Sequence, residues 1–282
     1  MTYFQFLAIF VGIPILILIG LTWRDRRSGR ELPPAFTHLN PWLTLGAHVL
    51  VALVYTTPWD NYLVATGVWF YDPALVTGIT IGWVPIEEYT FFIVQPIMTG
   101  LWLLFLLRRW PVNTGAPAPD RPRLRLAQTG ALGLVWLISL AVWLSGWAPG
   151  VYLSLILVWA LPPIMLQTYT GGDVLWQFRG LAALAILAPT IYLGAADSLA
   201  IAAGTWTIDP GQSLEIFLPG GLPLEEFVFF LMTNTLLVFG MTLALACVMG
   251  ARARQTLARL QGRPPREGSA EGTSGEMQPS GS

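Results

Sequence analysis

The sequence contains no lysine, one cysteine and two histidines. Without lysine the chain cannot form a retinal Schiff base, so a bundle of apolar helices would not make it a rhodopsin. The single cysteine, Cys247, excludes a disulfide within the chain, and His38 and His48 are too few for a histidine-rich metal centre. Charged residues form only 11% of the 282 residues, whereas soluble proteins carry about 25%. These absences exclude an ordinary soluble protein.

Motifs for common cofactors and substrates are also missing. No G-x-G-x-x-G follows a strand, so a dinucleotide or flavin fold is not indicated. No aspartate-rich pair offers magnesium to a diphosphate, and no serine or cysteine lies in a nucleophile motif. The net charge of −1 provides no basic surface for nucleic acid. The sequence therefore predicts a protein that uses no flavin, nicotinamide or metal and binds no nucleic acid.

Hydrophobic residues make up 54% of the chain and gather in long runs. A helix needs roughly 20 apolar residues to cross a bilayer. The predicted fold class is all-α: a polytopic membrane protein with seven transmembrane helices. We expect these spans at Tyr3–Trp23, Pro41–Thr57, Val84–Leu107, Leu126–Ser145, Gly150–Gln167, Leu181–Ala196 and Leu222–Met249.

The positions of the arginines predict an orientation, because arginine clusters mark the cytoplasmic ends of spans. Clusters follow the first, third and seventh predicted spans, and Arg179 precedes the sixth. With seven spans, all of them fall on one side if the N-terminus is outside. We expect a protein of the cytoplasmic membrane with its N-terminus outside and its C-terminus in the cytoplasm. The last segment, residues 251–282, is predicted to be a disordered cytoplasmic tail because it is rich in Gly, Ser, Pro and Glu.

Two segments of the chain share one pattern. The pattern D-x6-G-x-W-x2-D-P begins at Asp60 and recurs 137 residues later at Asp197, and P-x-E-E-x2-F-F begins at Pro85 and recurs 138 residues later at Pro223. Spans two and three therefore correspond to spans six and seven. We expect two parallel three-helix repeats, related by a pseudo-two-fold axis along the membrane normal. The predicted units are a first repeat (1–110), a linker with one transmembrane helix (111–148) and a second repeat (149–250).

Each P-x-E-E motif opens an apolar helix on the outer side of the membrane. The paired glutamates are Glu87 with Glu88 and Glu225 with Glu226. Proline suits a first helical turn, and carboxylates there face the positive end of the helix dipole, so ordinary helix starts are one interpretation. Ionisable groups at membrane depth are usually functional, however. Aromatic surroundings also favour a protonated carboxyl group, which can act as a general acid. We therefore predict that the four glutamates are catalytic acid–base groups.

Helical spacing turns the two glutamates of a pair about 100° apart. Glu87 shares a face with Phe91 and Val94, whereas Glu88 shares one with Phe92 and Gln95. The second repeat follows the same pattern. We expect the first glutamate of each pair to face an apolar surface and the second a more polar one, an asymmetry that suits an acid against a lipidic substrate with a base or hydrogen-bond partner behind it. An error of one residue in the helix phase reverses this assignment.

Aromatic residues surround both motifs. Trp and Tyr are common in interfacial belts, so membrane anchoring is one explanation for the tryptophans of the loops. An aromatic face also stabilises a nearby cation, so these residues are candidates for lining a site. The predicted substrate-binding residues are Phe91, Phe92, Phe229, Phe230, Trp69, Trp206 and Gln95.

The two copies of P-x-E-E-x2-F-F, each after a W-x2-D-P loop, resemble the lycopene cyclase domain family. Its members are small integral-membrane carotenoid cyclases of bacteria and fungi that bind no flavin. The resemblance covers roughly residues 1–110 and 149–250 and is similar to the form in which two such domains are fused. It implies a lycopene β-cyclase, an isomerase that acts on lycopene and related carotenoids in the bilayer lipid. Whether the chain forms a homo-oligomer or an assembly with other carotenoid enzymes stays open.

The chemistry that the resemblance implies suits the residues of the motifs. An acid protonates a terminal double bond of lycopene, an internal double bond attacks the carbocation, and a base removes a proton to leave a β-ionone ring. The products are γ-carotene and then β-carotene, without net redox change. The required groups are a protonated carboxyl, a carboxylate and aromatic walls. The sequence does not fix the ring type, the number of rings formed, or which glutamate is the acid.

A small membrane transporter is the alternative interpretation, because some transporters also have three helices, a linker helix and three parallel helices. Glutamates at broken helix ends would then bind a solute. Such a transporter should carry prolines in the middle of equivalent helices. Pro14, Pro162 and Pro189 do not fall at equivalent positions, whereas the symmetric prolines open helices. The cyclase is therefore the favoured interpretation.

Overall fold

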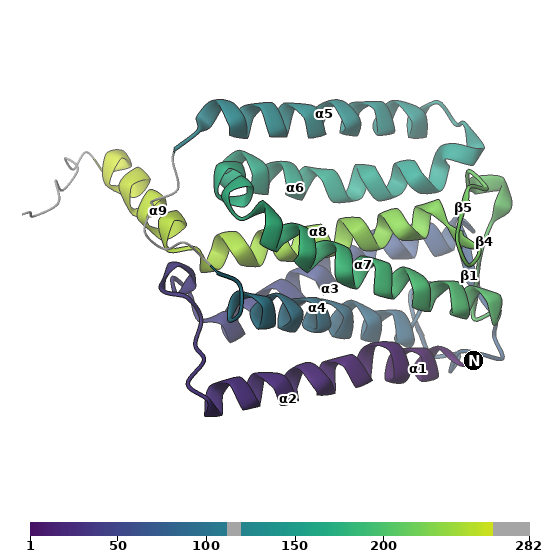
Figure 1. Ribbon diagram of the computed structural model, residues 1–282. Coiled ribbons are helices and arrows are strands. Elements are labelled where there is room, and N and C mark those ends of the chain that lie inside the picture. The colour runs from purple at the N-terminus through teal and green to yellow at the C-terminus, as the bar shows by residue number, and fades with distance from the viewer. Residues whose placement is uncertain (112–119, 262–282) are drawn as a thin grey trace, which may run out of the picture.

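The computed structural model describes residues 1–111 and 120–261, and it is built almost entirely of long helices that run side by side (Figure 1). The first long helix is continuous over α1, the π-helical stretch η1 and α2. The helical elements are α1 (Tyr3–Phe6), η1 (Leu7–Gly12), α2 (Ile13–Arg27), η2 (Pro34–Phe36), α3 (Pro41–Ala65), α4 (Ile86–Leu107), α5 (Pro122–Leu144), η3 (Ala148–Gly150), α6 (Val151–Gln177), α7 (Arg179–Ala202), η4 (Pro210–Gln212), α8 (Leu224–Leu245) and α9 (Cys247–Leu260).

Within the described ranges, six helical segments are long and apolar enough to cross a membrane. They contain α2, α4, α5, α6, α7 and α8. The protein is therefore a polytopic helical membrane protein, as the sequence predicts. The second predicted span, Pro41–Thr57, lies in α3, which is 25 residues long but is not one of these six. The count of seven stays a prediction.

Helices α4 and α8 form the centre of the bundle. Helix α4 packs against α2, α3, α7 and α8, and α8 packs against α6, α7, α3 and α4. Helix α5 lies at the edge against α6 (Figure 1). A buried polar network joins the central helices: the Asn234 side-chain oxygen accepts hydrogen bonds from Gln95 (2.8 Å) and Thr99 (2.7 Å), and its amide donates to Thr190 (3.0 Å). The two helices that begin with glutamate pairs are thus direct neighbours.

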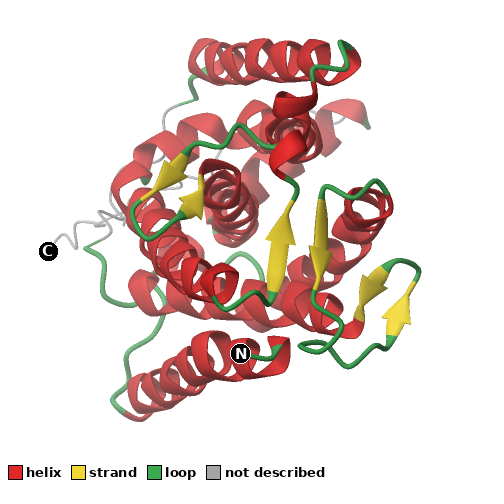
Figure 2. Cartoon of the chain, turned by 90° about the vertical axis from the view of Figure 1, so that its right-hand side faces the viewer, coloured by secondary structure: helices red, strands yellow, loops and turns green. Residues whose placement is uncertain are grey.

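Three short two-stranded ribbons cover one end of the bundle (Figure 2). Two are local hairpins, β2 (Thr80–Ile81) with β3 (Val84–Pro85) and β5 (Phe217–Leu218) with β6 (Leu222–Pro223). The third joins β1 (Trp69–Tyr71) to β4 (Trp206–Ile208), far apart in the chain. In this antiparallel pair Trp69 lies opposite Ile208 and Tyr71 opposite Trp206. The loops of the two predicted repeats therefore bind each other directly.

Several predicted boundaries are wrong, because α3, α6 and α7 are longer than predicted and α8 is shorter. Helix α3 passes through Pro58 and continues to Ala65, so Asp60 lies in a helix and not in an outer loop. Helix α8 ends at Leu245, where Ala246 turns to an extended conformation, and α9 follows. The predicted disordered tail is therefore helical from residue 251 to Leu260. Residues 262–282 lie outside the described residues.

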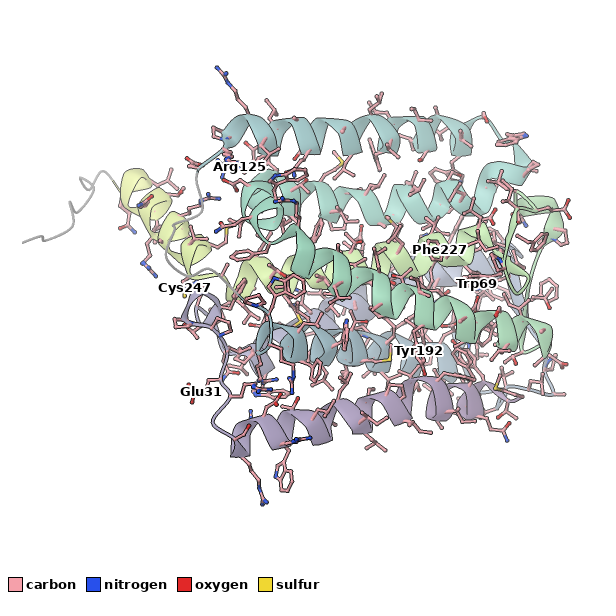
Figure 3. All side chains as sticks on the ribbon, viewed as in Figure 1. Glu31, Trp69, Arg125, Tyr192, Phe227 and Cys247 are labelled. Carbon is pink, nitrogen blue, oxygen red and sulfur yellow. The ribbon has the colours of Figure 1, made fainter. Side chains whose placement is uncertain are left out.

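The basic helix ends gather opposite the ribbons. The C-terminal ends of α2 and α4 and the starts of α5 and α7 lie at that end, as does the labelled Arg125, whereas the labelled Trp69 lies at the ribbon end (Figures 1 and 3). Arg109 binds Asp25 through two hydrogen bonds of 2.6 and 2.7 Å. Arg252 binds Asp173 in the same way at 2.7 and 2.9 Å. The first pair joins the last turn of α2 to the residue pair after α4, and the second joins the C-terminal part of α6 to α9.

Candidate active site

The P-x-E-E motifs sit where a short strand runs directly into a central helix. Pro85 ends β3 and Pro223 ends β6, both with extended backbones, and α4 and α8 start at the next residue. The preceding loops fold back on the helix starts, because Ile86 and Leu224 donate their backbone N–H groups to Ile79 (2.9 Å) and Ile216 (2.8 Å). This junction fixes both glutamates of each pair in the first helical turn.

The first glutamate of each pair holds the loop that precedes it. Glu87 accepts a hydrogen bond from the backbone N–H of Thr77 (2.6 Å). Glu225 accepts one from the backbone N–H of Leu214 (2.7 Å) and another from the Ser213 hydroxyl (3.2 Å). Both carboxyl groups are buried. The expected orientation is therefore reversed, since these residues face polar groups of the preceding loops and not an open apolar site.

The second glutamates face a small buried cavity of about 30 Å³, which we call the acidic chamber. Glu88 accepts a hydrogen bond from the Tyr71 hydroxyl (2.8 Å), and Glu226 accepts one from the Tyr152 hydroxyl (2.5 Å). Burial and the nearby Glu88 carboxylate raise the pKa of Tyr71 well above its usual value, so its hydroxyl keeps the proton that it donates. The chamber is lined by Tyr3, Phe6, Trp69, Tyr71, Glu88, Phe91, Asp197, Trp206, Glu226, Phe229 and Phe230.

The tryptophan of each half of the chain packs against a tyrosine of the other half. Trp206 packs against Tyr3, with 4.8 Å between ring centroids, and Trp69 packs against Tyr152 at 5.5 Å. The β1–β4 ribbon makes these contacts possible, because it holds each tryptophan loop over the other half. Phe91 also meets Phe230 across the centre at 6.3 Å. Both halves therefore build one chamber.

Two buried aspartates belong to this region and were not among the predicted site residues. Asp197 lines the chamber and accepts a hydrogen bond from the Trp206 indole N–H (2.9 Å). Asp60 is fully buried, and neither carboxyl oxygen has a hydrogen-bond partner within the part of the chain that the structure describes. Both residues open the repeated D-x6-G-x-W pattern. Their recurrence beside apolar runs was the signal that could have identified them.

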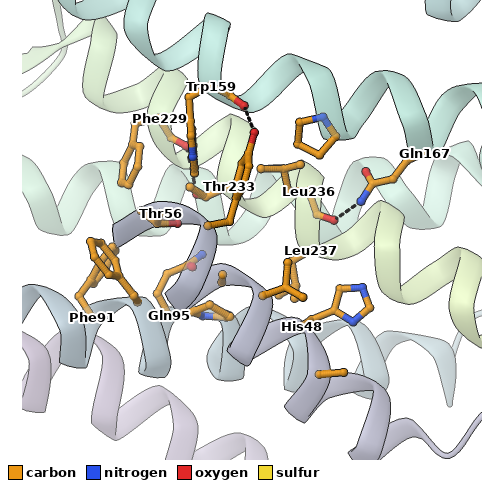
Figure 4. Close-up of a pocket in the computed structure, with 17 residues that line it drawn as sticks. His48, Thr56, Phe91, Gln95, Trp159, Gln167, Phe229, Thr233, Leu236 and Leu237 are labelled. Carbon is orange, nitrogen blue, oxygen red and sulfur yellow. Dashed lines mark hydrogen bonds between the residues drawn. The ribbon is translucent and has the colours of Figure 1, made fainter. Parts of the chain in front are cut away.

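A second, larger cavity adjoins the chamber (Figure 4). This apolar cleft has a volume of about 300 Å³ and lies between α3 and α6, above α4 and α8. Phe91 and Phe229 line both cavities. The cleft is lined by Ala47, His48, Val51, Ala52, Tyr55, Thr56, Phe91, Phe92, Gln95, Pro96, Trp159, Pro163, Gln167, Phe229, Thr233, Leu236 and Leu237.

The structure thus divides the predicted substrate-binding residues between two adjoining cavities. Trp69, Trp206 and Phe230 line the chamber, and Phe92 and Gln95 line the cleft. Among the described residues, no group of three His, Cys, Asp or Glu side chains is arranged to hold a metal ion. Buried carboxyl groups with aromatic walls, next to an apolar cleft inside a helical bundle, define a class of integral-membrane proteins equipped for proton chemistry on apolar substrates.

Comparison with known proteins identifies the family. The chain is 40% identical over 243 residues to lycopene beta-cyclase of Halobacterium salinarum, a match that covers 86% of this chain and 95% of that protein. It is 40% identical over 215 residues to the bifunctional lycopene cyclase/phytoene synthase of Colletotrichum graminicola, covering 73% of this chain and 36% of the fungal protein. It is 37% identical over 243 residues to the protein of the same name from Phaeosphaeria nodorum, covering 81% and 38%. The chain belongs to the lycopene cyclase family.

The chain spans about a third of the length of these fungal bifunctional relatives, but nearly the whole of the archaeal one. No family model matches the chain, and no solved structure matches it. The relatives support the cyclase interpretation and give no support to the transporter.

Proposed function

We propose that this protein cyclises the ends of lycopene to β-ionone rings, giving γ-carotene and then β-carotene without net redox change. The support from relatives is the 40% identity to a lycopene beta-cyclase over nearly the full length of both chains. The observation that carries the mechanism is the acidic chamber, in which Glu88 and Glu226 come from two different helices and face one aromatic-lined space. An apolar substrate reaches such a site from the bilayer.

The reaction needs one proton to be given and one to be taken back. In the proposed mechanism, the protonated carboxyl of one chamber glutamate, Glu88 or Glu226, adds its proton to the terminal double bond. The π electrons of an internal double bond then close the ring on the carbocation. The carboxylate of the other glutamate removes a proton from a ring carbon, so the substrate gains and loses one proton. The hydroxyls of Tyr71 and Tyr152 hold the two carboxyl groups in place.

The aromatic walls serve the cation that forms between these two proton transfers. An aromatic face stabilises a nearby positive charge, most strongly where water is absent. Trp69, Trp206 and Phe229 line the chamber. Indole and phenyl rings carry no oxygen that could capture the cation.

Glu87 and Glu225 have a different role in this proposal. Each accepts hydrogen bonds from the loop that precedes its helix. They are positioning residues, which hold the loops that carry Trp69 and Trp206 over the chamber. The free chamber has room for about one or two waters, so the shared wall of Phe91 and Phe229 has to move when a substrate end enters.

The decisive experiment is expression in a bacterium that accumulates lycopene. We expect the red pigment to change to orange or yellow and chromatography to identify γ- and β-carotene. Lycopene that stays unchanged, in cells whose membranes contain the protein, would contradict the cyclase. A transporter would leave the pigment chemically unaltered and change only its distribution.

We also propose that α3 crosses the membrane, which brings the number of spans to seven, and that the N-terminus is outside. With 25 residues, α3 is about 37 Å long, more than the roughly 30 Å of the hydrocarbon core. The packing pattern supports two repeats, because α3 contacts α4 and α8 as α7 contacts α8 and α4. The pairing of the two equivalent loops in the β1–β4 ribbon supports them as well.

Accessibility of the two termini tests this topology. With seven spans, a tag at Met1 is expected to react with an impermeant reagent outside the cell, whereas a tag at Ser282 is expected to stay protected. Two tags on the same side would require an even number of spans. A tag at Ser282 that reacts outside, with the Met1 tag protected, would show that the orientation inferred from the arginines is reversed.

A further inference from the structure

The apolar cleft opens sideways toward the lipid. Helices α3 and α6 both pack on α8, and the cleft lies in the gap between them (Figure 4). On the α3 side this gap is lined by Val51 and Tyr55, whose side chains are 63% and 41% exposed. Exposed apolar side chains on a helix of a membrane protein contact acyl chains. Because α3 is proposed above to cross the membrane, we expect this side of the cleft to face acyl chains.

A lipid-facing groove continues the cleft along the outside of α3. This groove is lined by Leu50, Val51, Val54, Tyr55, Pro58, Trp59 and Trp159. Three of its residues, Val51, Tyr55 and Trp159, also line the cleft. The cleft in turn shares Phe91 and Phe229 with the acidic chamber. Groove, cleft and chamber thus form one series, in which each cavity shares its wall with the next.

Tyr55 bridges the opening. Its hydroxyl donates a hydrogen bond to the backbone carbonyl of Trp159 on α6 (2.9 Å), and its ring stacks on the Trp159 ring at 5.8 Å between centroids. Trp159 continues the stack to Trp59 at 4.5 Å. A flat polyene can slide against such a wall of aromatic faces, because dispersion contacts with stacked rings do not depend on one fixed position.

The dimensions of the cleft and the chamber determine how much of a carotenoid they can enclose. Along α3 the cleft extends from Ala47 to Thr56, which is about 13 Å of helix. Its volume of about 300 Å³ is at the lower end of the roughly 300–1,000 Å³ of ligand pockets. A linear carotenoid is about as long as the hydrocarbon core is thick. The cleft and chamber can therefore enclose one end of the chain but not both.

We propose that the gap between α3 and α6 is a lateral entrance through which an acyclic carotenoid enters end-first from the bilayer, so that one end is cyclised while the other half of the chain stays in the groove and the lipid. This proposal rests on the cyclase function proposed above. The one-ringed product has to withdraw through the same entrance before its second end can reach Glu88 and Glu226. Two rings therefore require two separate binding events.

A pulse-chase experiment with the unaltered protein tests the two binding events. Labelled lycopene in liposomes is converted with limiting enzyme, and excess unlabelled lycopene is added while labelled one-ringed product is present. We expect the chase to slow the conversion of labelled γ-carotene to β-carotene in proportion to the excess added, because released product has to compete. Labelled chains that proceed to two rings at an undiminished rate would overturn the proposal. Absence of any ring formation would instead contradict the cyclase function.

A matched pair of substitutions tests the position of the entrance. Val51→Trp places a large side chain in the gap, whereas Val135→Trp makes the same change on the lipid-exposed side of α5, where Val135 is 43% exposed. We expect Val51→Trp to lower the rate of cyclisation about tenfold or more, because the added ring occupies the path, and Val135→Trp to leave it nearly unchanged. Equal rates for the two variants at equal membrane content would overturn the entrance between α3 and α6. If Val51→Trp does not accumulate, Val54→Trp, in the groove that continues the cleft, replaces it in the same comparison with Val135→Trp.

Discussion

In the second half of the chain, Trp206 donates its indole N–H to Asp197 at 2.9 Å, whereas Trp69 and Asp60, at the equivalent positions of the first half, make no such bond. Within the described residues, the Trp69 N–H and both oxygens of Asp60 have no hydrogen-bond partner, and both side chains are buried. The same pattern of residues thus forms a hydrogen-bonded pair, which we call closed, on one side of the chamber and a pair without a hydrogen bond, which we call open, on the other.

The aromatic neighbours of the two tryptophans differ as well. Trp206 is packed between Tyr3 (4.8 Å) and Phe6 (5.0 Å) of the first helix. Trp69 instead stands edge-on to Trp59 at 6.0 Å, and Trp59 continues into the stack at the cleft. Trp206 is therefore held against the first helix, whereas Trp69 lies beside Trp59, which lines the groove together with Trp159. A sequence repeat can preserve the residues of a site and still give its copies different duties.

The largest expected effect comes from removing the chamber carboxyls in turn. Glu88→Gln and Glu226→Gln keep an oxygen that can accept from Tyr71 or Tyr152 but have no proton to give, so each should lower cyclisation about 10²–10⁴-fold. The measurement is carotenoid product per unit of membrane protein. If the two halves share one chamber, either variant leaves lycopene unreacted. A one-ringed product from either variant would mean that each half serves its own end of the substrate.

The first glutamates are the matched controls. In Glu87→Gln and Glu225→Gln the amide oxygen can still accept from Thr77 or Leu214, so activity should fall less than about tenfold while stability falls by about 1–3 kcal/mol. Activity and thermal unfolding in detergent are measured on the same preparations. A loss of activity as large as in Glu88→Gln and Glu226→Gln would show that Glu87 and Glu225 also act as acid–base groups.

The two ion pairs at the opposite end offer a second comparison of the halves. Asp25 is held by Arg109, with Arg30 3.8 Å away, whereas Asp173 also accepts from the backbone N–H of Arg121 at 3.0 Å. Arg109→Ala leaves Asp25 buried with little support and should cost about 3 kcal/mol. Arg252→Ala should cost about half as much, because Asp173 keeps a partner. Equal shifts in denaturant unfolding would show that the backbone bond contributes nothing.

The smallest effect separates the closed and open tryptophan pairs. Trp206→Phe removes the N–H that Asp197 accepts, whereas Trp69→Phe removes an N–H that has no partner among the described residues. Both changes lose the same volume, so the difference isolates the hydrogen bond. Trp206→Phe should be less stable than Trp69→Phe by about 1 kcal/mol. Identical melting temperatures would mean that the two pairs are equivalent in solution.

The sequence predicted where the two glutamate-bearing helices begin but not which way their glutamates face. The P-x-E-E motifs correctly predicted helix starts that bring four glutamates to neighbouring helices. One residue in a helix corresponds to about 100° of rotation, so which glutamate faces the chamber depends on how α4 packs against α8. That packing is a tertiary property, and it turned Glu88 and Glu226 toward the chamber instead of Glu87 and Glu225.

The aspartates were missed for a related reason. The predicted spans ended at Thr57 and Ala196, just before Asp60 and Asp197. Helices α3 and α7 continue beyond both, so the aspartates are buried. The β1–β4 ribbon was beyond prediction as well, since strands of three residues carry little periodicity and their pairing joins segments 137 positions apart.

The polar network at Asn234 has a consequence for how the protein is made. Helix α4 leaves the ribosome long before α8, so for the time needed to synthesise the intervening chain Gln95 and Thr99 can bond only locally within α4, where their side chains lie 3.3 Å apart. In lipid, a polar side chain without a partner from a neighbouring helix favours association with whatever donor or acceptor is nearby. The arrival of Asn234 in the bundle gives both side chains a partner from another helix, so the polar core of the protein is complete only when α8 has been inserted.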